Sequence, residues 1–170
     1  MWRLLQQIRK VGIISEPAPS ADASMLQREL QEQIARVFGR ALAIRQVDAG
    51  SCNGCELEIQ ALHNPYYNLE GMGIRFVASP RHADALLVTG PVSRHMAQAL
   101  RRTYEATPEP KLVIAVGDCG ACGGVFGESY ASLGAVANVI PVDVEIPGCP
   151  PTPTALLQGI LAAIGKRASS

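Results

Sequence analysis

The run Ala85-Leu86-Leu87-Val88-Thr89 decides the fold, because its near-continuous apolar character predicts a strand that is buried on both faces. A second run, Leu112-Val113-Ile114-Ala115-Val116, has the same character. Between them, residues 91–104 show a helical pattern with Met96 and Leu100 on one side. Buried strands that alternate with helices form a parallel sheet with helices on both faces, so the sequence predicts an α/β fold.

The same alternation continues toward both ends of the chain. Helical patterns cover residues 23–38, 55–62 and 151–164, strand patterns cover 41–47 and 74–78, and a weaker segment lies near 136–140. We therefore expect residues 23–170 to form one domain. Residues 1–22 are expected to form an N-terminal arm, with an amphipathic helix over 1–13 and a linker that contains Pro17 and Pro19. This arm either packs on its own domain or docks on another subunit or a membrane surface.

Composition limits the classes of function. The chain has 170 residues, of which 48% are hydrophobic, and fifteen basic residues balance fifteen acidic ones, which argues against a nucleic-acid partner. No apolar run is long enough to span a membrane, and the N-terminus lacks the features of a signal peptide. We therefore expect a cytoplasmic protein, in which five cysteines indicate metal binding or redox chemistry rather than disulfides.

Four of the cysteines follow predicted strands. Cys52 and Cys55 come after the strand at 41–47, Cys119 follows the strand that ends at Val116, and Cys149 follows the run Val144-Glu145-Ile146-Pro147-Gly148. Ligands of parallel α/β folds bind at the carboxyl ends of the strands. The sequence therefore predicts that these four thiols meet at one edge of the sheet.

One close pair and two distant single cysteines supply the four thiolates that a cubane iron–sulfur cluster requires. A zinc ribbon more often has two close pairs, and a redox dithiol at Cys52 and Cys55 leaves Cys119 and Cys149 unexplained. The spacing favours a cluster, while zinc and redox or structural thiols stay open. Cys122 is surplus: a role as a competing ligand three residues after Cys119 stays open, and we favour the interpretation of a small residue in a tight turn.

Several residues near the cysteines are candidates for tuning such a centre. The amides of Gly54, Gly120 and Gly148 and the hydroxyl of Ser51 are candidate hydrogen-bond donors to sulfur. Two acids, Glu56 and Glu58, follow Cys55, and at most one of them is expected to face the centre. Asp118, which precedes Cys119, is expected to be a turn residue. The three histidines have no metal-like spacing and are interpreted as surface or interface residues; they are His63, His82 and His95.

Four strings together carry a resemblance to a known family. They are G-S-C-N-G-C-E-L-E at 50–58, R-F-V-A-S-P-R-H-A-D-A-L-L-V-T-G at 75–90, G-D-C-G-A-C-G-G-V-F at 117–126 and I-P-V-D-V-E-I-P-G-C-P-P-T-P at 140–153. The chain resembles the small electron-transfer subunit shared by membrane-bound nickel–iron hydrogenases and respiratory complex I. The resemblance implies a flavodoxin-like, three-layer domain that holds one 4Fe–4S cluster beside a large subunit. It implies the ligands Cys52, Cys55, Cys119 and Cys149, with Cys122 at a variable position.

Two positions favour the hydrogenase side of this family. Cys52 and Cys55 are separated by two residues, whereas the complex I branch has adjacent cysteines, and Thr152 stands where that branch tends to carry an arginine. The chain also stops at Ser170, soon after the last motif, which resembles the energy-converting, membrane-bound group that includes the formate hydrogenlyase type.

The resemblance therefore implies an electron-relay subunit of an anaerobic oxidoreductase complex, with no bond chemistry on this chain. Its implied partners are a large nickel–iron subunit, a ferredoxin-like iron–sulfur subunit and integral membrane subunits, with this chain held peripherally on the cytoplasmic side of the membrane. Two alternatives are kept. The first is the equivalent subunit of a quinone-reducing, complex I-like assembly or of a nickel-free, hydrogenase-related complex. The second is a zinc-stabilised binding module without a redox role.

Overall fold

The computed structural model describes residues 2, 6 and 22–168. The predicted helix over residues 1–13 and the linker at 15–20 therefore lie outside the described residues, apart from positions 2 and 6. The predicted division between an arm at 1–22 and a domain at 23–170 stays a prediction. Within the described part, no helix is both long enough and apolar enough to cross a membrane.

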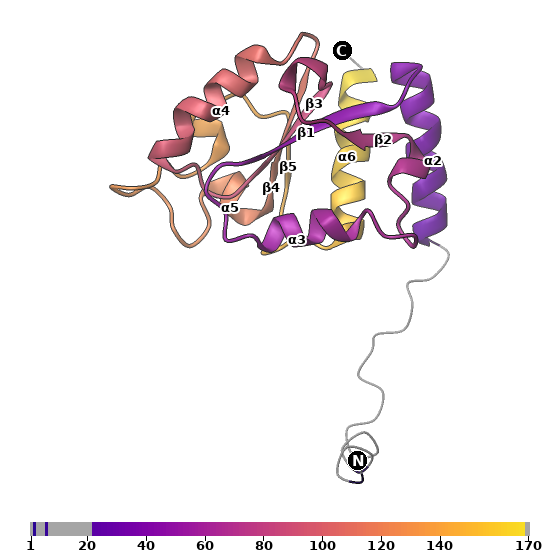
Figure 1. Cartoon of the computed structure of the whole chain (residues 1–170), viewed down its shortest axis with the longest axis horizontal. Helices are drawn as coiled ribbons and strands as arrows, with labels where there is room; N and C mark the ends of the chain where they lie inside the picture. The colour runs from indigo at the N-terminus through magenta and orange to yellow at the C-terminus, as the bar shows by residue number, and fades with distance from the viewer. Residues whose placement is uncertain (1, 3–5, 7–21, 169–170) are drawn as a thin grey trace.

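Five parallel strands form one sheet in the order β2-β1-β3-β4-β5 (Figure 1). The strands are β1 (Leu42–Asp48), β2 (Ile74–Phe76), β3 (Ala85–Thr89), β4 (Leu112–Val116) and β5 (Val144–Ile146). The predicted strands at 85–89 and 112–116 are confirmed, β1 is displaced by one residue, and β2 ends two residues early. This strand order is that of flavodoxin-like folds, in which ligands bind where the order reverses, between β1 and β3. The predicted flavodoxin-like α/β fold is confirmed.

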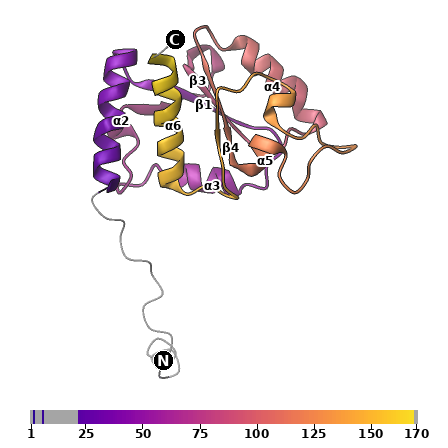
Figure 2. The same cartoon turned by 180° about the vertical axis from the view of Figure 1, so that it is seen from behind.

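Three helices cover one face of the sheet. They are α2 (Asp22–Phe38), α3 (Gly54–Ala61) and α6 (Pro153–Ala168), and α2 and α6 lie side by side in both views (Figures 1 and 2). Leu30 and Ile34 of α2 are buried against the sheet. The last helix begins at Pro153, two residues later than predicted, because Thr152 caps it: the Thr152 hydroxyl accepts a hydrogen bond from the amide of Ala155 at 3.2 Å.

The other face is covered by α4 (Arg94–Ala106) (Figure 1) and by the short 3-10 helix η3 (Val136–Asn138). The structure begins α4 three residues after the predicted start, because the Ser93 hydroxyl accepts from the amide of Met96 and caps the helix. Leu100 is fully buried, as predicted, whereas Met96 is only partly buried. A single 3-10 turn occupies the weak segment near 136–140.

The glycine-rich segment after β4 is helical, although Asp118 and Cys122 were predicted to be turn residues. Residues Gly117–Cys122 form a short helix, α5. Gly117 turns the chain off the strand with a φ of 77°, and Gly123 ends the helix with a φ of 87°. The two glycines thus allow one closed helical turn to fit between the sheet edge and the following loop.

Candidate metal centre

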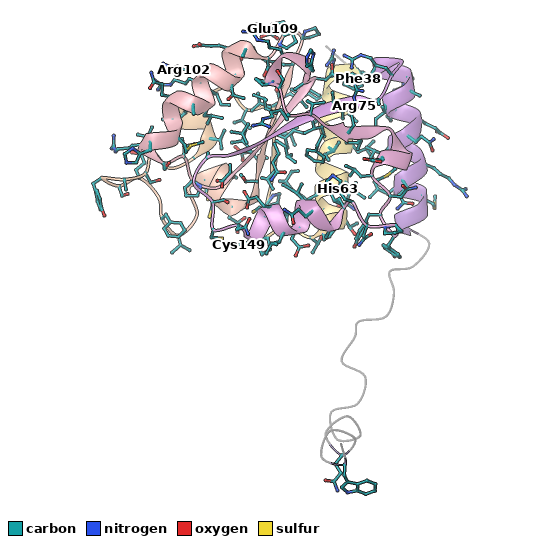
Figure 3. All side chains as sticks on the ribbon, viewed as in Figure 1. Phe38, His63, Arg75, Arg102, Glu109 and Cys149 are labelled. Atoms are coloured by element: carbon teal, nitrogen blue, oxygen red, sulfur yellow. The ribbon has the colours of Figure 1, made fainter. Side chains whose placement is uncertain are left out.

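The strand register places the ends of four strands at one level. Asp48 pairs with Thr89, Thr89 with Val116, and Val116 with Ile146. Cys52, Cys119 and Cys149 follow three of these strand ends by three or four residues, and Cys55 lies in the first turn of α3. The loops that carry the cysteines therefore leave the sheet side by side. Figure 3 shows Cys149 at this edge, on the opposite side of the molecule from Glu109.

The four predicted ligands interact electrostatically with one another. The pKa of the Cys55 thiol is raised to about 11, first by burial and then by the charges of Glu56, Cys52, Cys119 and Cys149 in that order. The pKa of Cys119 is also raised, first by burial and then by the charges of Cys149 and Cys52. Thiols that disfavour each other's ionisation lie close together. The structure thus brings all four together, and their role as ligands stays a prediction.

Cys122 lies apart from this set. Its thiol donates to the carbonyl oxygen of Asp118 at 3.1 Å, one turn back along α5. Its charge is the last of the causes that raise the pKa of Cys119 and is absent from those that act on Cys55. Cys122 therefore lies in the last turn of the helix α5 rather than in the predicted tight turn, and its exclusion from the ligands stays a prediction.

Two glycines leave room for the thiols. A Cβ atom at Gly117 would lie 2.8 Å from the Cys55 Sγ atom, and a Cβ atom at Gly124 would lie 2.7 Å from the Cys119 Sγ atom. Both glycines have positive φ angles, of 77° and 54°. The backbone therefore approaches the thiols more closely than any other residue would allow.

Side chains fix the loop that carries Cys52. The Asp48 carboxylate accepts from the amides of Gly50 and Ser51, both at 2.8 Å, and the Ser51 hydroxyl accepts from the amide of Asn53 at 3.1 Å. These bonds hold the chain between β1 and α3 in a defined turn. The Ser51 hydroxyl acts as an acceptor in this turn, and its predicted donation to sulfur stays a prediction.

Sequence reasoning missed a buried polar pair beside Cys55. The Glu56 side chain is only 6% exposed and accepts a hydrogen bond from the hydroxyl of Thr89, the last residue of β3. Glu58 is partly exposed, so Glu56 is the more deeply placed of the two acids. The signal available in the sequence was a threonine that ends an otherwise apolar strand.

All three histidines are exposed, as their interpretation as surface or interface residues predicted. Figure 3 shows His63 away from Cys149, and its ring lies 5.1 Å from the ring of Phe76. Among residues 2, 6 and 22–168, no group of three or more His, Cys, Asp or Glu side chains has the geometry to hold a single metal ion.

The donor set fits an iron–sulfur cluster. The four thiols lie on three loops and interact electrostatically, and a side chain at Gly117 or Gly124 would crowd the thiol of Cys55 or Cys119. The Gly148 amide is excluded as a hydrogen-bond donor to the cluster sulfur, as which it was a candidate, since it already donates to the Asp118 carboxylate at 2.7 Å. The cysteines Cys52, Cys55, Cys119 and Cys149 would hold the group, which needs four thiolates for a cubane.

The strand order and the cysteines define a class: a flavodoxin-like α/β domain with a candidate metal centre at the carboxyl ends of its strands. The chain belongs to the family described as NADH ubiquinone oxidoreductase, 20 Kd subunit, because the family's sequence model matches residues 52–163. It is therefore a member of a family of oxidoreductase subunits, as the sequence motifs predicted.

Individual relatives agree with this assignment. The chain is 47% identical to a probable membrane-bound hydrogenase subunit, mbhJ, of Pyrococcus furiosus, over 80% of this chain and 81% of that protein. It is 43% identical to formate hydrogenlyase subunit 7 of Escherichia coli over 89% of this chain, but spans only 56% of that longer protein. Among solved structures, a chain of the membrane-bound sulfane sulfur reductase, an archaeal respiratory membrane complex, matches with a TM-score of 0.69 and 34% identity, over 84% of this chain and 77% of that chain.

Proposed function

We propose that this chain is the electron-transfer subunit of a membrane-bound nickel–iron hydrogenase complex. Cys52, Cys55, Cys119 and Cys149 hold one 4Fe–4S cluster, which takes up and releases single electrons when bound. The chain relays electrons between the active site of a large nickel–iron subunit and a ferredoxin-like subunit. It performs no bond chemistry itself, and it is held on the cytoplasmic side of the membrane through these partners and integral membrane subunits.

The convergence of four thiols from three loops is the observation that carries the proposal. Their mutual effect on the pKa values of Cys55 and Cys119 supports a common site at the strand ends. The hydrogenase and formate hydrogenlyase relatives support the assignment to a hydrogenase complex.

Two features of the chain's own residues bear on loading of the site. Because the pKa of Cys55 is raised to about 11, its thiol is protonated near neutral pH, and loading has to release this proton to solvent, which opposes binding. The turn at Asp48 and the buried Glu56–Thr89 pair fix the elements that carry Cys52 and Cys55 before any metal arrives. A site that is fixed in advance loses less conformational entropy when it binds its metal.

Anaerobic reconstitution of the full chain with ferrous iron and sulfide tests the cluster. We expect about four irons and four sulfides per chain and the paramagnetic spectrum of a reduced 4Fe–4S cluster. Serine at position 52, 55, 119 or 149 should abolish or strongly reduce loading, whereas the matched variant Cys122→Ser should load normally. A colourless protein with one zinc per chain would overturn the cluster and support the zinc-stabilised binding module.

A second candidate is the equivalent subunit of a nickel-free or quinone-reducing complex. The 34% identity to a chain of the sulfane sulfur reductase complex and the family's description favour it. Purification of the native complex with its large subunit separates the two candidates. Stoichiometric nickel and hydrogen-dependent dye reduction support the hydrogenase. Absence of both, with reduction of a quinone or of sulfane sulfur, supports the second candidate.

A further inference from the structure

Asp118 joins two of the loops that carry cysteines. Its amide donates to the carbonyl oxygen of Gly148 at 2.9 Å, and its carboxylate accepts from the Gly148 amide at 2.7 Å. Asp118 directly precedes Cys119, and Gly148 directly precedes Cys149. One residue pair therefore sets the separation of the two loops.

The loop around Cys149 depends on this pair for its hydrogen bonds. Pro147, Pro150 and Pro151 have no amide proton, so Gly148 and Cys149 supply the only backbone donors between positions 147 and 151. The Gly148 donor is committed to the Asp118 carboxylate. Removal of that acceptor would leave the short, proline-bounded loop without its tie to α5.

A second pair of reciprocal hydrogen bonds joins the same two strands at their other, amino-terminal ends. The Asp143 amide donates to the Val113 carbonyl at 2.9 Å, and the Asp143 carboxylate accepts from the Val113 amide at 2.8 Å. This second pair joins the starts of β4 and β5, as the first joins their ends. Each pair is partly buried, and in each pair the two residues are thirty positions apart in the sequence. Asp143 therefore offers a matched comparison that lies away from the cysteines.

We propose that Asp118 is a positioning residue for the candidate cluster, because it clamps the Cys119 and Cys149 loops together and places a negative charge beside Cys119. The inference rests on the proposed function. The clamp resists the separation of two ligands when the cluster is lost or oxidised. The charge stabilises the more oxidised, less negative state of a nearby centre and so lowers its reduction potential.

Three variants of the full chain separate the clamp from the charge. Asp118→Ala removes both, Asp118→Asn keeps an acceptor oxygen for Gly148 but removes the charge, and Asp143→Ala breaks the matched pair at the other edge. After anaerobic reconstitution, two quantities are measured: the rate of iron loss to a chelator, and the midpoint potential from a redox titration followed by electron paramagnetic resonance.

We expect Asp118→Ala to lose iron about 10–100-fold faster than the wild type, the range found when partners of metal ligands are removed. Asp118→Asn should retain iron like the wild type, and both variants should have a higher midpoint potential. Asp143→Ala should lower the melting temperature without a change in either quantity. A merely structural Asp118 would behave like Asp143 and leave the potential unchanged.

The contrary results are distinct. If Asp118→Ala lost iron at the wild-type rate and had the wild-type midpoint potential, the inference would be wrong, but the assignment of a cluster would be unaffected. Equal, rapid iron loss from Asp118→Asn and Asp118→Ala would overturn the clamp. Should Asp118→Ala fail to fold, the potential of Asp118→Asn still tests the charge. Failure of the wild-type chain to take up iron and sulfide would instead overturn the proposed function.

Discussion

The Glu56 carboxylate accepts a hydrogen bond from the Thr89 hydroxyl, and both side chains are buried. Thr89 ends the central strand β3, and Glu56 lies in the first turn of α3, next to Cys55. The second carboxylate oxygen of Glu56 is buried without a hydrogen-bond partner within the described part of the chain. Thr89 therefore supplies the one side-chain hydrogen bond that the buried Glu56 carboxylate accepts within the described part of the chain.

Thr89→Val should destabilise the protein, since valine matches the shape of threonine but cannot donate to Glu56. A buried acceptor that loses its partner costs about 1–3 kcal/mol, and the free energy of unfolding of the cluster-free protein in urea should fall by that amount. Thr103→Val is the control, because the Thr103 hydroxyl donates to Ala99 within α4 at an exposed position. Equal effects of the two substitutions would show that the Glu56–Thr89 bond contributes nothing.

Gly117→Ala should impair loading of the candidate centre. The new Cβ atom would lie 2.8 Å from the Cys55 Sγ atom and 3.2 Å from the Gly148 carbonyl oxygen, at a φ of 77°. Strain of this kind costs about 1–3 kcal/mol, and we expect a lower melting temperature and fewer irons per chain after reconstitution.

Gly165→Ala in α6 is the matched control for that glycine. Its Cβ atom would meet no atom within 4 Å, and alanine favours a helix interior by about 0.5–1 kcal/mol over glycine. Iron content should be unchanged and the melting temperature equal or higher. Normal loading of Gly117→Ala would show that the close approach at Gly117 is not required.

The sequence predicted the elements of the fold better than the contacts between them. The strands at 85–89 and 112–116 were evident, because a parallel strand buried on both faces is apolar throughout. The strand register aligns the strand ends at Asp48, Thr89, Val116 and Ile146. This register depends on pairing between segments far apart in the sequence, which no local pattern encodes. The sequence could therefore place the cysteines at one edge, but not the residues that fix them there.

The acids near the cysteines illustrate the same limit. Glu56 and Glu58 are equivalent in sequence as acids at the start of a helix, and only the folded structure buries Glu56 and places it against Thr89. Asp118 was predicted to be a turn residue, but its carboxylate bonds to a residue thirty positions away. Tertiary contacts of this kind are visible only when the sheet is assembled.

The cluster-free protein should lose stability as the pH rises from about 9 to 11. Burial, followed by the charge of Glu56 and then those of the other cysteines, raises the pKa of Cys55 from 9.0 to about 11. The folded state thus holds the Cys55 proton more tightly than the unfolded chain does. The resulting stabilisation is complete below pH 9 and is lost as the pH passes the folded-state pKa, and the raised pKa of Cys119 acts in the same direction.

Urea unfolding midpoints at a series of pH values measure this effect. The wild-type midpoint should fall more steeply above pH 9 than that of Cys55→Ser, which lacks the titrating thiol. Parallel pH profiles for the two proteins would assign the decline to other groups and contradict the raised pKa of Cys55.

Lys111 should stabilise the end of α4 without any effect on the candidate centre. Its side chain is 8% exposed, and its ammonium donates to the carbonyl oxygens of Tyr104 and Thr107 at 3.0 and 3.2 Å. The ammonium also lies 3.9 Å from the centroid of the Tyr104 ring. Lys111→Met keeps the apolar stem but removes these interactions, and we expect a loss of about 2 kcal/mol in the free energy of unfolding.

Glu109 provides the control and a second measurement. Its carboxylate pairs with Lys111 at 3.0 Å but is exposed, so Glu109→Ala should change stability little. A hydrogen bond from Lys111 lowers the pKa of Glu109, and this pKa should rise toward its ordinary value in Lys111→Met when followed by nuclear magnetic resonance. Because Glu109 and Cys149 lie on opposite sides of the molecule (Figure 3), both variants should load iron normally. Loss of iron from Lys111→Met would show that the stability of α4 and the integrity of the cysteine edge are coupled across the sheet.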